Sequence, residues 1–269
     1  MDVTAAERVL RHDRVIVACA LAIICLLSWY YLLLGAGTGM SSIAMTTWQF
    51  PPPVFASSGA GHWPLQYWLV MIIMWWVMMI AMMVPSAGPM ILLYARVNRK
   101  SHKPDAQAAN TVPTALFLSG YLTGWLVFSL TATLLQWVLE QAGLVHGMMM
   151  WSNNHTLSAV FLLAAGIYQF SPLKRACLTH CQSPVVFLSQ HWRNGSWGAL
   201  RMGLEHGCYC VGCCWFLMLL LFVGGIMNLV WIAGLTILVL LEKLVPPQLQ
   251  VARVSGAMML LAGAYLLLA

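Results

Sequence analysis

Long apolar runs alternate along the chain with short polar segments, and the runs have the length of membrane-spanning helices. A helix needs about 20 mostly apolar residues to cross a hydrocarbon core of roughly 30 Å. Seven stretches come close to or exceed that length: approximately residues 15–34, 66–94, 112–138, 151–170, 206–223, 227–244 and 251–268. The sequence therefore predicts an all-α fold, a polytopic transmembrane helix bundle of about seven spans, as a single integral membrane domain over residues 1–269.

Two of these spans come from one run without a charge, residues 207–241, which we expect to turn at Gly224 and Gly225. Lys and Arg collect in cytoplasmic loops, and all 13 of them fall on one side if the seven spans alternate. This predicts an inner-membrane, multi-pass protein with its N-terminus inside and its C-terminus outside. Merging the two spans would place Lys243 and Arg253 on the opposite side, so the charges favour the turn.

The first span also has features of a signal peptide, because three Arg residues precede an apolar run that ends near Gly35. Its apolar stretch of about 20 residues is longer than the usual 7 to 15 of a signal core. That length favours a retained membrane span, with cleavage as the alternative.

Composition excludes several classes of protein. Hydrophobic residues make up 61% of the chain and charged residues 7%, against roughly 25% charged in a soluble domain. The net charge of +6 is too thinly spread for a nucleic-acid surface. Phosphate-binding glycine loops and the nucleophile-elbow motif are missing from the sequence. No catalytic residue is assigned, and a role other than that of an enzyme is favoured.

Candidate chemistry is concentrated in the cysteines. Six of the eight lie in the window 177–214, at or near the predicted cytoplasmic face: Cys177, Cys181, Cys208, Cys210, Cys213 and Cys214. Thiols there are kept reduced, which favours metal binding or redox chemistry over structural disulfides. Thiolate is a soft ligand that selects Cu(I), Zn(II) or iron–sulfur clusters.

Helical spacing sorts these cysteines. At about 100° per residue, His206, Cys210 and Cys213 fall within an arc of roughly 60°, with Cys214 beside them. Cys208 points nearly the other way and is not expected to be a ligand of the same site. The alternative is that cysteine is a small residue common in buried places, but ligands that converge at one membrane face seldom serve packing alone.

A second pair of cysteines, Cys177 and Cys181, shares one helical face if the segment after Pro172 is helical. Three glycines near the cluster are expected to let another segment approach closely: Gly203, Gly207 and Gly212.

Methionines line one face of the second span. Thioethers are neutral soft ligands for Cu(I), whereas Met is also a flexible filler of helix packing. The residues assigned to a metal path on this span are Met78, Met82 and Met83. We expect Pro85 and Pro89 to break the helix and to free backbone carbonyls at the depth of the cysteine cluster.

Three strings resemble a bacterial family of predicted metal-binding integral membrane proteins. They are Trp75-x-x-Met78-Met79-x-Ala81-Met82-Met83-x-Pro85-Ser86, Tyr168-Gln169-x-Ser171-Pro172-Leu173-Lys174-x-x-Cys177-Leu178-x-x-Cys181 and Arg201-Met202-Gly203-x-x-His206-Gly207-x-x-Cys210-x-Gly212-Cys213-Cys214-Trp215. The resemblance covers roughly residues 65–245. It implies a metal role for the matching Cys and His positions: Cys177, Cys181, His206, Cys210, Cys213 and Cys214.

These observations lead to one favoured hypothesis and two alternatives. The favoured one is a membrane protein that binds a soft metal ion, with copper(I) preferred over zinc, for transport or for delivery to a metallochaperone or a membrane enzyme. The first alternative is a membrane thiol–disulfide oxidoreductase that uses Cys177/Cys181 and Cys213/Cys214. The second is a non-catalytic subunit of a larger membrane enzyme with a structural metal. The methionines favour copper, because disulfide exchange has no use for thioethers.

Overall fold

The computed structural model describes residues 5–50, 52, 62–100, 107–245 and 250–268. Its named elements are all helices, which confirms the predicted all-α class. They are α1 (Ala5–Leu33), α2 (Leu65–Lys100), α3 (Gln107–Gln141), α4 (His155–Gln169), α5 (Pro172–Gln182), α6 (Pro184–His191), α7 (Gly195–Leu219), α8 (Leu221–Gly224), α9 (Leu229–Leu244) and α10 (Val251–Leu268).

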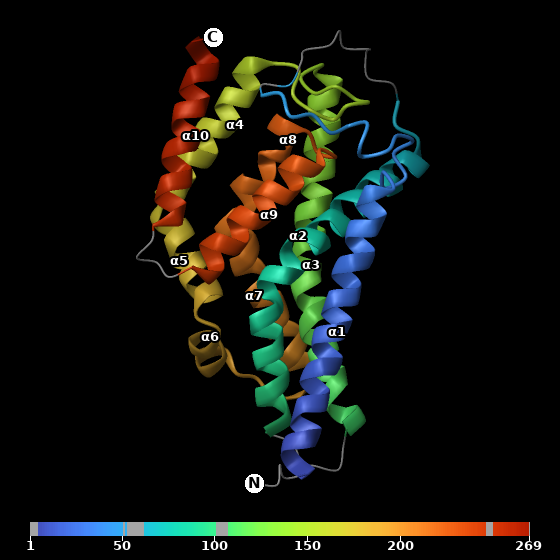
Figure 1. Ribbon diagram of the computed structural model, residues 1–269, viewed down its shortest axis with the longest axis vertical. Coiled ribbons are helices and arrows are strands. Elements are labelled where there is room, and N and C mark those ends of the chain that lie inside the picture. Colours follow the sequence, from blue (N-terminus) through green and yellow to red (C-terminus); the bar gives the residue numbers. More distant parts are fainter. Residues whose placement is uncertain (1–4, 51, 53–61, 101–106, 246–249, 269) are drawn as a thin grey trace.

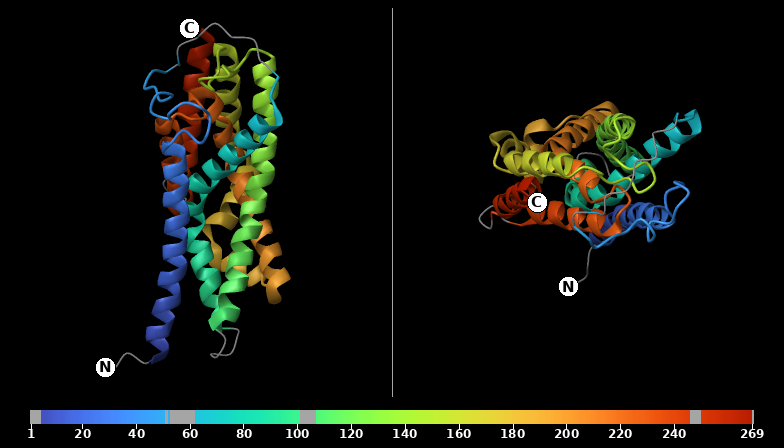
Figure 2. Two further views of the ribbon diagram at one scale, coloured as in Figure 1. Left: turned by 90° about the vertical axis from the view of Figure 1, so that its right-hand side faces the viewer. Right: turned by 90° about the horizontal axis from the view of Figure 1, so that it is seen from above.

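The long helices run along one axis of an elongated bundle (Figures 1 and 2). Helix α1 begins at one end of this axis and α10 finishes at the other (Figure 1). Helices α2, α3 and α7 occupy the middle, whereas α10 packs beside α4 at one edge. The two ends of the described chain therefore lie at opposite ends of the bundle.

Five helical segments are long and apolar enough to cross a membrane: Val15–Leu33, Leu65–Arg99, Val112–Gln141, Gly195–Gly224 and Val251–Leu268. Helices α4 and α5 form a sixth if they are taken as one span, bent by 66°. The structure thus has five or six candidate spans rather than seven. The difference lies partly in α9, whose 16 residues extend only about 24 Å.

The turn expected within the charge-free run 207–241 is present. Helix α8 ends at Gly224, and Gly225 follows with a φ of 104°, a left-handed conformation that favours glycine. Asn228 then begins α9: its side-chain oxygen accepts from Val230 N at 3.1 Å, and its Nδ2 donates to Gly224 O at 2.8 Å. One residue therefore fixes both sides of the turn.

The expected break at Pro85 and Pro89 is wrong, because α2 continues through both prolines to Lys100. The helix instead changes direction, as the two ribbon views of Figure 2 show. Proline removes one backbone hydrogen bond, and in membrane helices nearby hydroxyl groups commonly compensate. The carbonyl groups that lose a backbone partner are Ala81 O and Pro85 O, four residues before each proline. Between them, Met83 O accepts additional hydrogen bonds from Ser86 Oγ at 2.8 Å and from Tyr121 Oη at 3.3 Å.

The segment after Pro172 is helical, which is the condition under which Cys177 and Cys181 share one helical face. Ser171 caps α5 by accepting from Lys174 N, and Pro172 occupies the first turn, where its missing N–H costs nothing. The side chain of Lys174 is buried and donates to Glu242 Oε2 at 2.6 Å. This ion pair joins α5 to α9.

Helices α3 and α7 touch through what we call the glycine interface. It consists of one G-x-x-x-G pair on each helix: Gly120 and Gly124 on α3, and Gly203 and Gly207 on α7. A Cβ added at Gly203 would lie 1.9 Å from Phe117 O, and one at Gly120 would lie 2.1 Å from Leu200 O. Small residues let membrane helices approach this closely, so the glycine interface sets the distance between α3 and α7.

The glycine interface gives a direct prediction for Gly203→Ala. The new methyl group meets a backbone oxygen, which cannot rotate away, so we expect a loss of stability at the upper end of the about 1–3 kcal/mol typical of overpacking. Thermal unfolding of the purified protein in detergent measures it. Gly234→Ala is the matched control, because nothing lies within 4 Å of a Cβ at that helical position. Equal melting temperatures for the two variants would contradict the argument.

Candidate metal centre

Sulfur atoms from three helices converge in the interior of the bundle, in what we call the sulfur cluster. Helix α7 contributes three buried cysteines, α5 two half-buried ones and α2 one buried methionine. The members are Cys210, Cys213, Cys214, Cys177, Cys181 and Met83. The five cysteines are free thiols.

Two contacts between sulfur atoms join the three helices. Cys181 Sγ lies 4.0 Å from Cys213 Sγ, which links α5 to α7. Cys214 Sγ lies 4.0 Å from Met83 Sδ, which links α7 to α2. Two sulfur ligands at roughly 2.3 Å from one metal ion are separated by at most about 4.6 Å. Both pairs therefore lie at a distance that one soft metal ion could bridge.

The helical spacing of the α7 cysteines orients their thiols. Cys213 Sγ and Cys214 Sγ contact Cys210 O at 3.1 and 3.0 Å, one turn earlier in the same helix. Cys213 and Cys214 thus project toward different neighbours, α5 and α2, from adjacent positions.

Cys210 has a different environment from the other thiols because a lysine reaches it. Lys243 Nζ, on α9, lies 3.0 Å from Cys210 Sγ and donates to Ser86 Oγ at 2.9 Å. Tyr121 Oη lies 3.1 Å from the same sulfur. A buried ammonium group is costly unless an anion accompanies it. The Lys243 ammonium therefore stabilises Cys210 as a thiolate, which is the form that binds metal ions.

Lys243 and Tyr121 are site residues that the sequence interpretation did not identify. Lys243 had a usable signal, since an ionisable residue in an otherwise apolar membrane helix is a functional candidate by default. Tyr121 had none, because its hydroxyl group reaches the cluster only through the packing of α3 on α7.

His206 is buried one turn before Cys210, at 3% exposure. Aromatic rings surround it, with centroids of Phe187, Tyr121 and Phe117 at 5.4, 5.7 and 6.2 Å. Its Nδ1 has no hydrogen-bond partner within the described part of the chain. A buried nitrogen without a partner is an available ligand. Its membership of the same centre as Cys210 stays a prediction.

Two glycine expectations are confirmed at the cluster. A Cβ at Gly212 would lie 2.8 Å from Cys177 Sγ, so this glycine makes room for Cys177 against α7. A Cβ at Gly207 would lie 2.8 Å from Tyr121 O. Cys208, by contrast, is exposed on the far side of α7, as its helical phase predicts.

The methionines of α2 divide into two groups. Met83 belongs to the sulfur cluster through its contact with Cys214 Sγ. Met78 and Met82 precede it on α2 and are fully buried in the apolar core. A role for Met78 and Met82 in a metal path therefore stays a prediction.

Over the described residues, no three His, Cys, Asp or Glu side chains form a group that could hold a metal ion. The sulfur atoms of the cluster meet in pairs. Cys181 contacts Cys213, Cys214 contacts the thioether of Met83, and Cys210 contacts the ammonium group of Lys243. Binding of a metal ion by more than two thiols would therefore require side chains to move from the positions described.

Comparison with known proteins places the chain in a family. A family model described as PpoB2, copper chaperone, matches residues 72–266, which span from α2 into α10 and include the whole sulfur cluster. No curated protein and no solved structure matches the chain. The motif-based resemblance is confirmed to the extent that the family is copper-related. The chain belongs to the copper-chaperone family PpoB2.

Proposed function

We propose that this protein is a membrane copper chaperone that holds Cu(I) in the sulfur cluster and delivers it to a partner protein. The observation that carries the proposal is the convergence of thiols and a thioether from α2, α5 and α7 in the bundle interior. Soft sulfur ligands select Cu(I). Membership of a copper-chaperone family supports copper over the thiol–disulfide and structural-metal alternatives.

The charges around the cluster support a monovalent cation. Two thiolates and one Cu(I) carry a formal net charge of −1, which is costly to bury without compensation. Lys243 supplies the compensating positive charge 3.0 Å from Cys210 Sγ. Met83 adds a neutral ligand, so it increases the coordination of copper without adding charge. The neutral thioether favours Cu(I) over zinc, which binds thiolate, imidazole and carboxylate ligands.

The difference in burial between the two groups of thiols suggests a direction for release. Cys210, Cys213 and Cys214 are buried, whereas Cys177 and Cys181 are half-buried. Cys181 Sγ and Cys213 Sγ are close enough to share one ion. Copper then passes from α7 to α5 by exchange of one sulfur ligand at a time, with His206 as a further candidate ligand.

We place the protein in the bacterial inner membrane with its N-terminus in the cytoplasm, in the multi-pass arrangement that the basic residues favour. The long apolar helices support a membrane location. In this orientation the outer loop between α3 and α4 faces away from the cytoplasm, and α5, α6 and the start of α7 lie at the cytoplasmic end. Delivery then occurs to a partner on the cytoplasmic side.

The first test replaces Cys210 and Cys213 by Ser. We expect the double variant to lose bound Cu(I) in the purified protein, because serine keeps the size of the side chain but removes the soft ligand. Metal analysis under reducing conditions measures the stoichiometry. Cys208→Ser is the matched control, since it removes an exposed thiol from the same helix, and it should retain the parent's copper.

Unchanged copper in the double variant would overturn the assignment of these thiols. A disulfide between Cys181 and Cys213 in the parent, found by mass spectrometry together with that result, would instead favour the thiol–disulfide alternative, because these two sulfurs lie 4.0 Å apart.

The second test concerns the thioether. Met83→Leu keeps the volume at a cost below about 1.5 kcal/mol but removes a ligand, so we expect weaker Cu(I) binding with little change in melting temperature. Competition with a colorimetric Cu(I) chelator gives the affinity. Met78→Leu and Met82→Leu, made separately, determine whether the metal path extends along α2. If Met83→Leu binds copper like the parent, Met83 serves packing alone.

The third test determines the orientation. Cysteines are introduced one at a time at Arg201, on α7, and at Met148, in the loop between α3 and α4, where both parent side chains are exposed. A membrane-impermeant maleimide applied to intact spheroplasts should label Met148→Cys, and should label Arg201→Cys only after permeabilisation. The reverse pattern would show that the orientation is inverted.

A further inference from the structure

Two histidines outside the sulfur cluster lie close together on the short helices α5 and α6. The ring centroids of His180, on α5, and His191, the last residue of α6, are 6.3 Å apart. We call these two residues the histidine pair. Both side chains are half-buried, and neither has a role in the copper chemistry proposed above.

A hydrogen bond to the backbone fixes the tautomer of each ring. His180 Nδ1 lies 2.8 Å from Ala176 O, and His191 Nδ1 lies 3.2 Å from Phe187 O, in each case four residues earlier in the same helix. A carbonyl oxygen can only accept, so Nδ1 carries the hydrogen in both rings. The neutral imidazole then has its free lone pair on Nε2. Histidines that bind metal ions are commonly held in this way, with the other ring N–H donating to a backbone carbonyl.

Aromatic rings hold the histidine pair in place. His180 stacks on Tyr209 of α7 at a centroid distance of 4.2 Å, and His191 stacks on Phe187 at 4.7 Å. Neither Nε2 has a hydrogen-bond partner among the described residues, and neither belongs to the unpartnered atoms that are sealed inside the bundle. In both rings Nε2 is therefore left for a ligand.

The spacing of the two rings suits one metal ion. An ion about 2.0 Å from the Nε2 atoms of two imidazoles separates the ring centroids by at most about 6.4 Å. The observed 6.3 Å lies just inside this limit, where the rings stand on opposite sides of the ion and leave its other coordination positions open. Since the described residues hold no group of three His, Cys, Asp or Glu ligands, a third ligand would come from another molecule.

The histidine pair adjoins the sulfur cluster on two helices. On α5, His180 comes three residues after Cys177 and lies beside it on the helix surface. On α7, Tyr209, the ring on which His180 stacks, comes four residues before Cys213 and lies beside it in the same way. An ion held by the half-buried thiol of Cys177 is therefore next to the pair.

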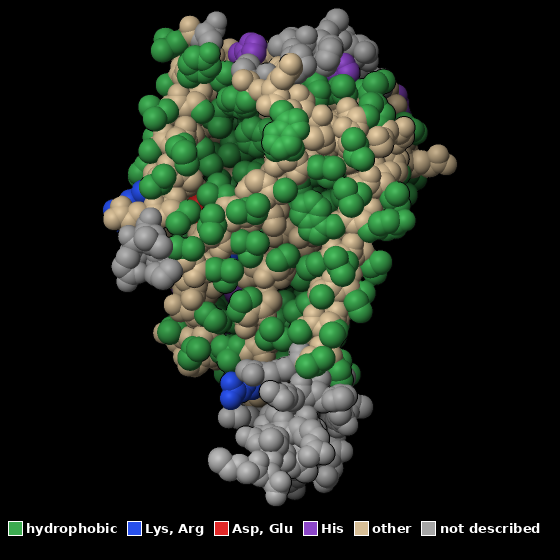
Figure 3. Space-filling view, viewed as in Figure 1, with side chains coloured by type: hydrophobic (Ala, Val, Ile, Leu, Met, Phe, Trp, Pro, Cys, Tyr) green, Lys and Arg blue, Asp and Glu red, His purple; other side chains and the backbone are tan. Residues whose placement is uncertain are grey.

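The pair lies toward the end of the bundle where basic residues are exposed. Helix α6 is nearer to the end where α1 begins than to the end where α10 finishes (Figure 1). Arg193 follows His191 by two residues and is 40% exposed, and Arg201 is 58% exposed. On the face drawn in Figure 3, hydrophobic side chains cover the bundle between its ends. A water-soluble partner therefore approaches from an end, and this end is the nearer one to the pair.

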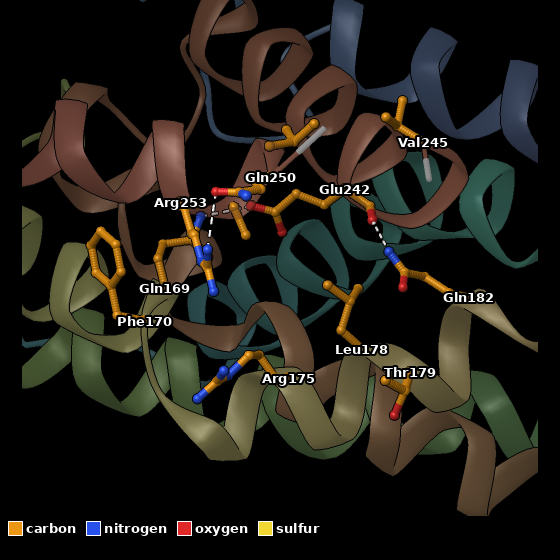
Figure 4. Close-up of a pocket in the computed structure, with 12 residues that line it drawn as sticks. Gln169, Phe170, Arg175, Leu178, Thr179, Gln182, Glu242, Val245, Gln250 and Arg253 are labelled. Atoms are coloured by element: carbon orange, nitrogen blue, oxygen red, sulfur yellow. Dashed lines mark hydrogen bonds between the residues drawn. The ribbon is translucent and has the colours of Figure 1, made fainter. Parts of the chain in front are cut away.

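The opposite side of α5 offers no ligand for a soft ion. It faces a pocket of about 580 Å³, where Thr179, Gln182 and the guanidinium group of Arg175 form part of the wall (Figure 4). Thiol, thioether and imidazole groups are missing from the described lining of this pocket. An ion that moves along α5 from the sulfur cluster therefore meets its next ligands on the His180 side.

We propose that the histidine pair is a second, weaker copper site, from which Cu(I) passes to a thiolate of a partner protein. His180 and His191 each bind through Nε2, and the partner's thiolate takes an open position before the imidazoles dissociate. Imidazole is a harder ligand than thiolate, so the pair holds Cu(I) less tightly than the sulfur cluster does. The ion remains Cu(I) throughout, and only metal–ligand bonds form and break.

This inference rests on the proposed function for the identity of the ion, and its first test counts ions in the full-length protein. Cu(I) is titrated without oxygen, in competition with a colorimetric chelator, and X-ray absorption identifies the ligands. We expect one tightly bound ion with sulfur ligands and a second, weaker one that adds imidazole scattering. Cys210→Ser with Cys213→Ser should lose the tight ion and keep the weaker one. A single ion at saturation in the parent would overturn the second site.

The second test uses His180→Asn with His191→Asn, which separates a ligand role from a structural one. The amide nitrogen of Asn can take the place of Nδ1 and donate to the same carbonyl oxygen, but nothing replaces Nε2. We expect the weaker ion to bind at least tenfold less tightly, since even the loss of an outer-shell partner commonly costs 10- to 100-fold, and its imidazole scattering to vanish. Transfer of Cu(I) to glutathione, a simple thiol, should be at least tenfold slower.

The matched control is His62→Asn with His155→Asn. It removes two exposed imidazoles that lie before α2 and at the start of α4, and it should bind both ions like the parent.

Two results would overturn the proposal. If the variant of the histidine pair binds the second ion like the parent, the two rings serve packing alone. If it loses both ions, the histidines belong to the sulfur cluster and no separate site exists. A failure of the proposed function has a different signature, which is unchanged tight copper in Cys210→Ser with Cys213→Ser.

Discussion

The close approach of α3 and α7 is the constraint on which the arrangement of the candidate metal centre depends. The glycine interface brings backbone against backbone, because a Cβ at Gly203 would lie 1.9 Å from Phe117 O. This contact places Tyr121 Oη 3.1 Å from Cys210 Sγ and lets the same hydroxyl group reach Met83 O on α2. A wider separation would remove a hydroxyl group that links all three helices at the depth of the thiols.

Two adjacent charged residues of α9 connect this helix to α5 and α7. Glu242 pairs with Lys174 on α5, and Lys243 contacts Cys210 on α7. Burying an ionised group is costly unless a partner is close by, so each contact fixes α9 at a defined height and rotation. Because both contacts start from α9, they also fix the positions of α5 and α7 relative to each other. These two helices supply the five thiols of the sulfur cluster.

Much of this arrangement could be predicted from the sequence, because helical phase is a local property. Helical phase predicts the outward direction of Cys208, and the length and charge pattern of residues 207–241 predict the turn at Gly224 and Gly225; the structure contains both. The continuation of α2 through Pro85 could not be predicted in this way. The contacts around this part of α2 come from other helices, as the hydrogen bond from Tyr121 to Met83 O shows. The contact of Lys243 with Cys210 also joins distant segments, and such packing leaves no periodic signal in the chain.

The position of α5 has a kinetic consequence. Cys177 packs against Gly212, and α5 is held at its start by the buried Lys174 and the Ser171 cap. The α3 side of α7 is closed by the glycine interface. In the proposed function, an ion handed to Cys181 leaves by way of α5, so its residence time would follow the local opening of that short helix and not the much rarer unfolding of the whole bundle. Retention and release of the ion would then be adjusted by the stability of 11 residues.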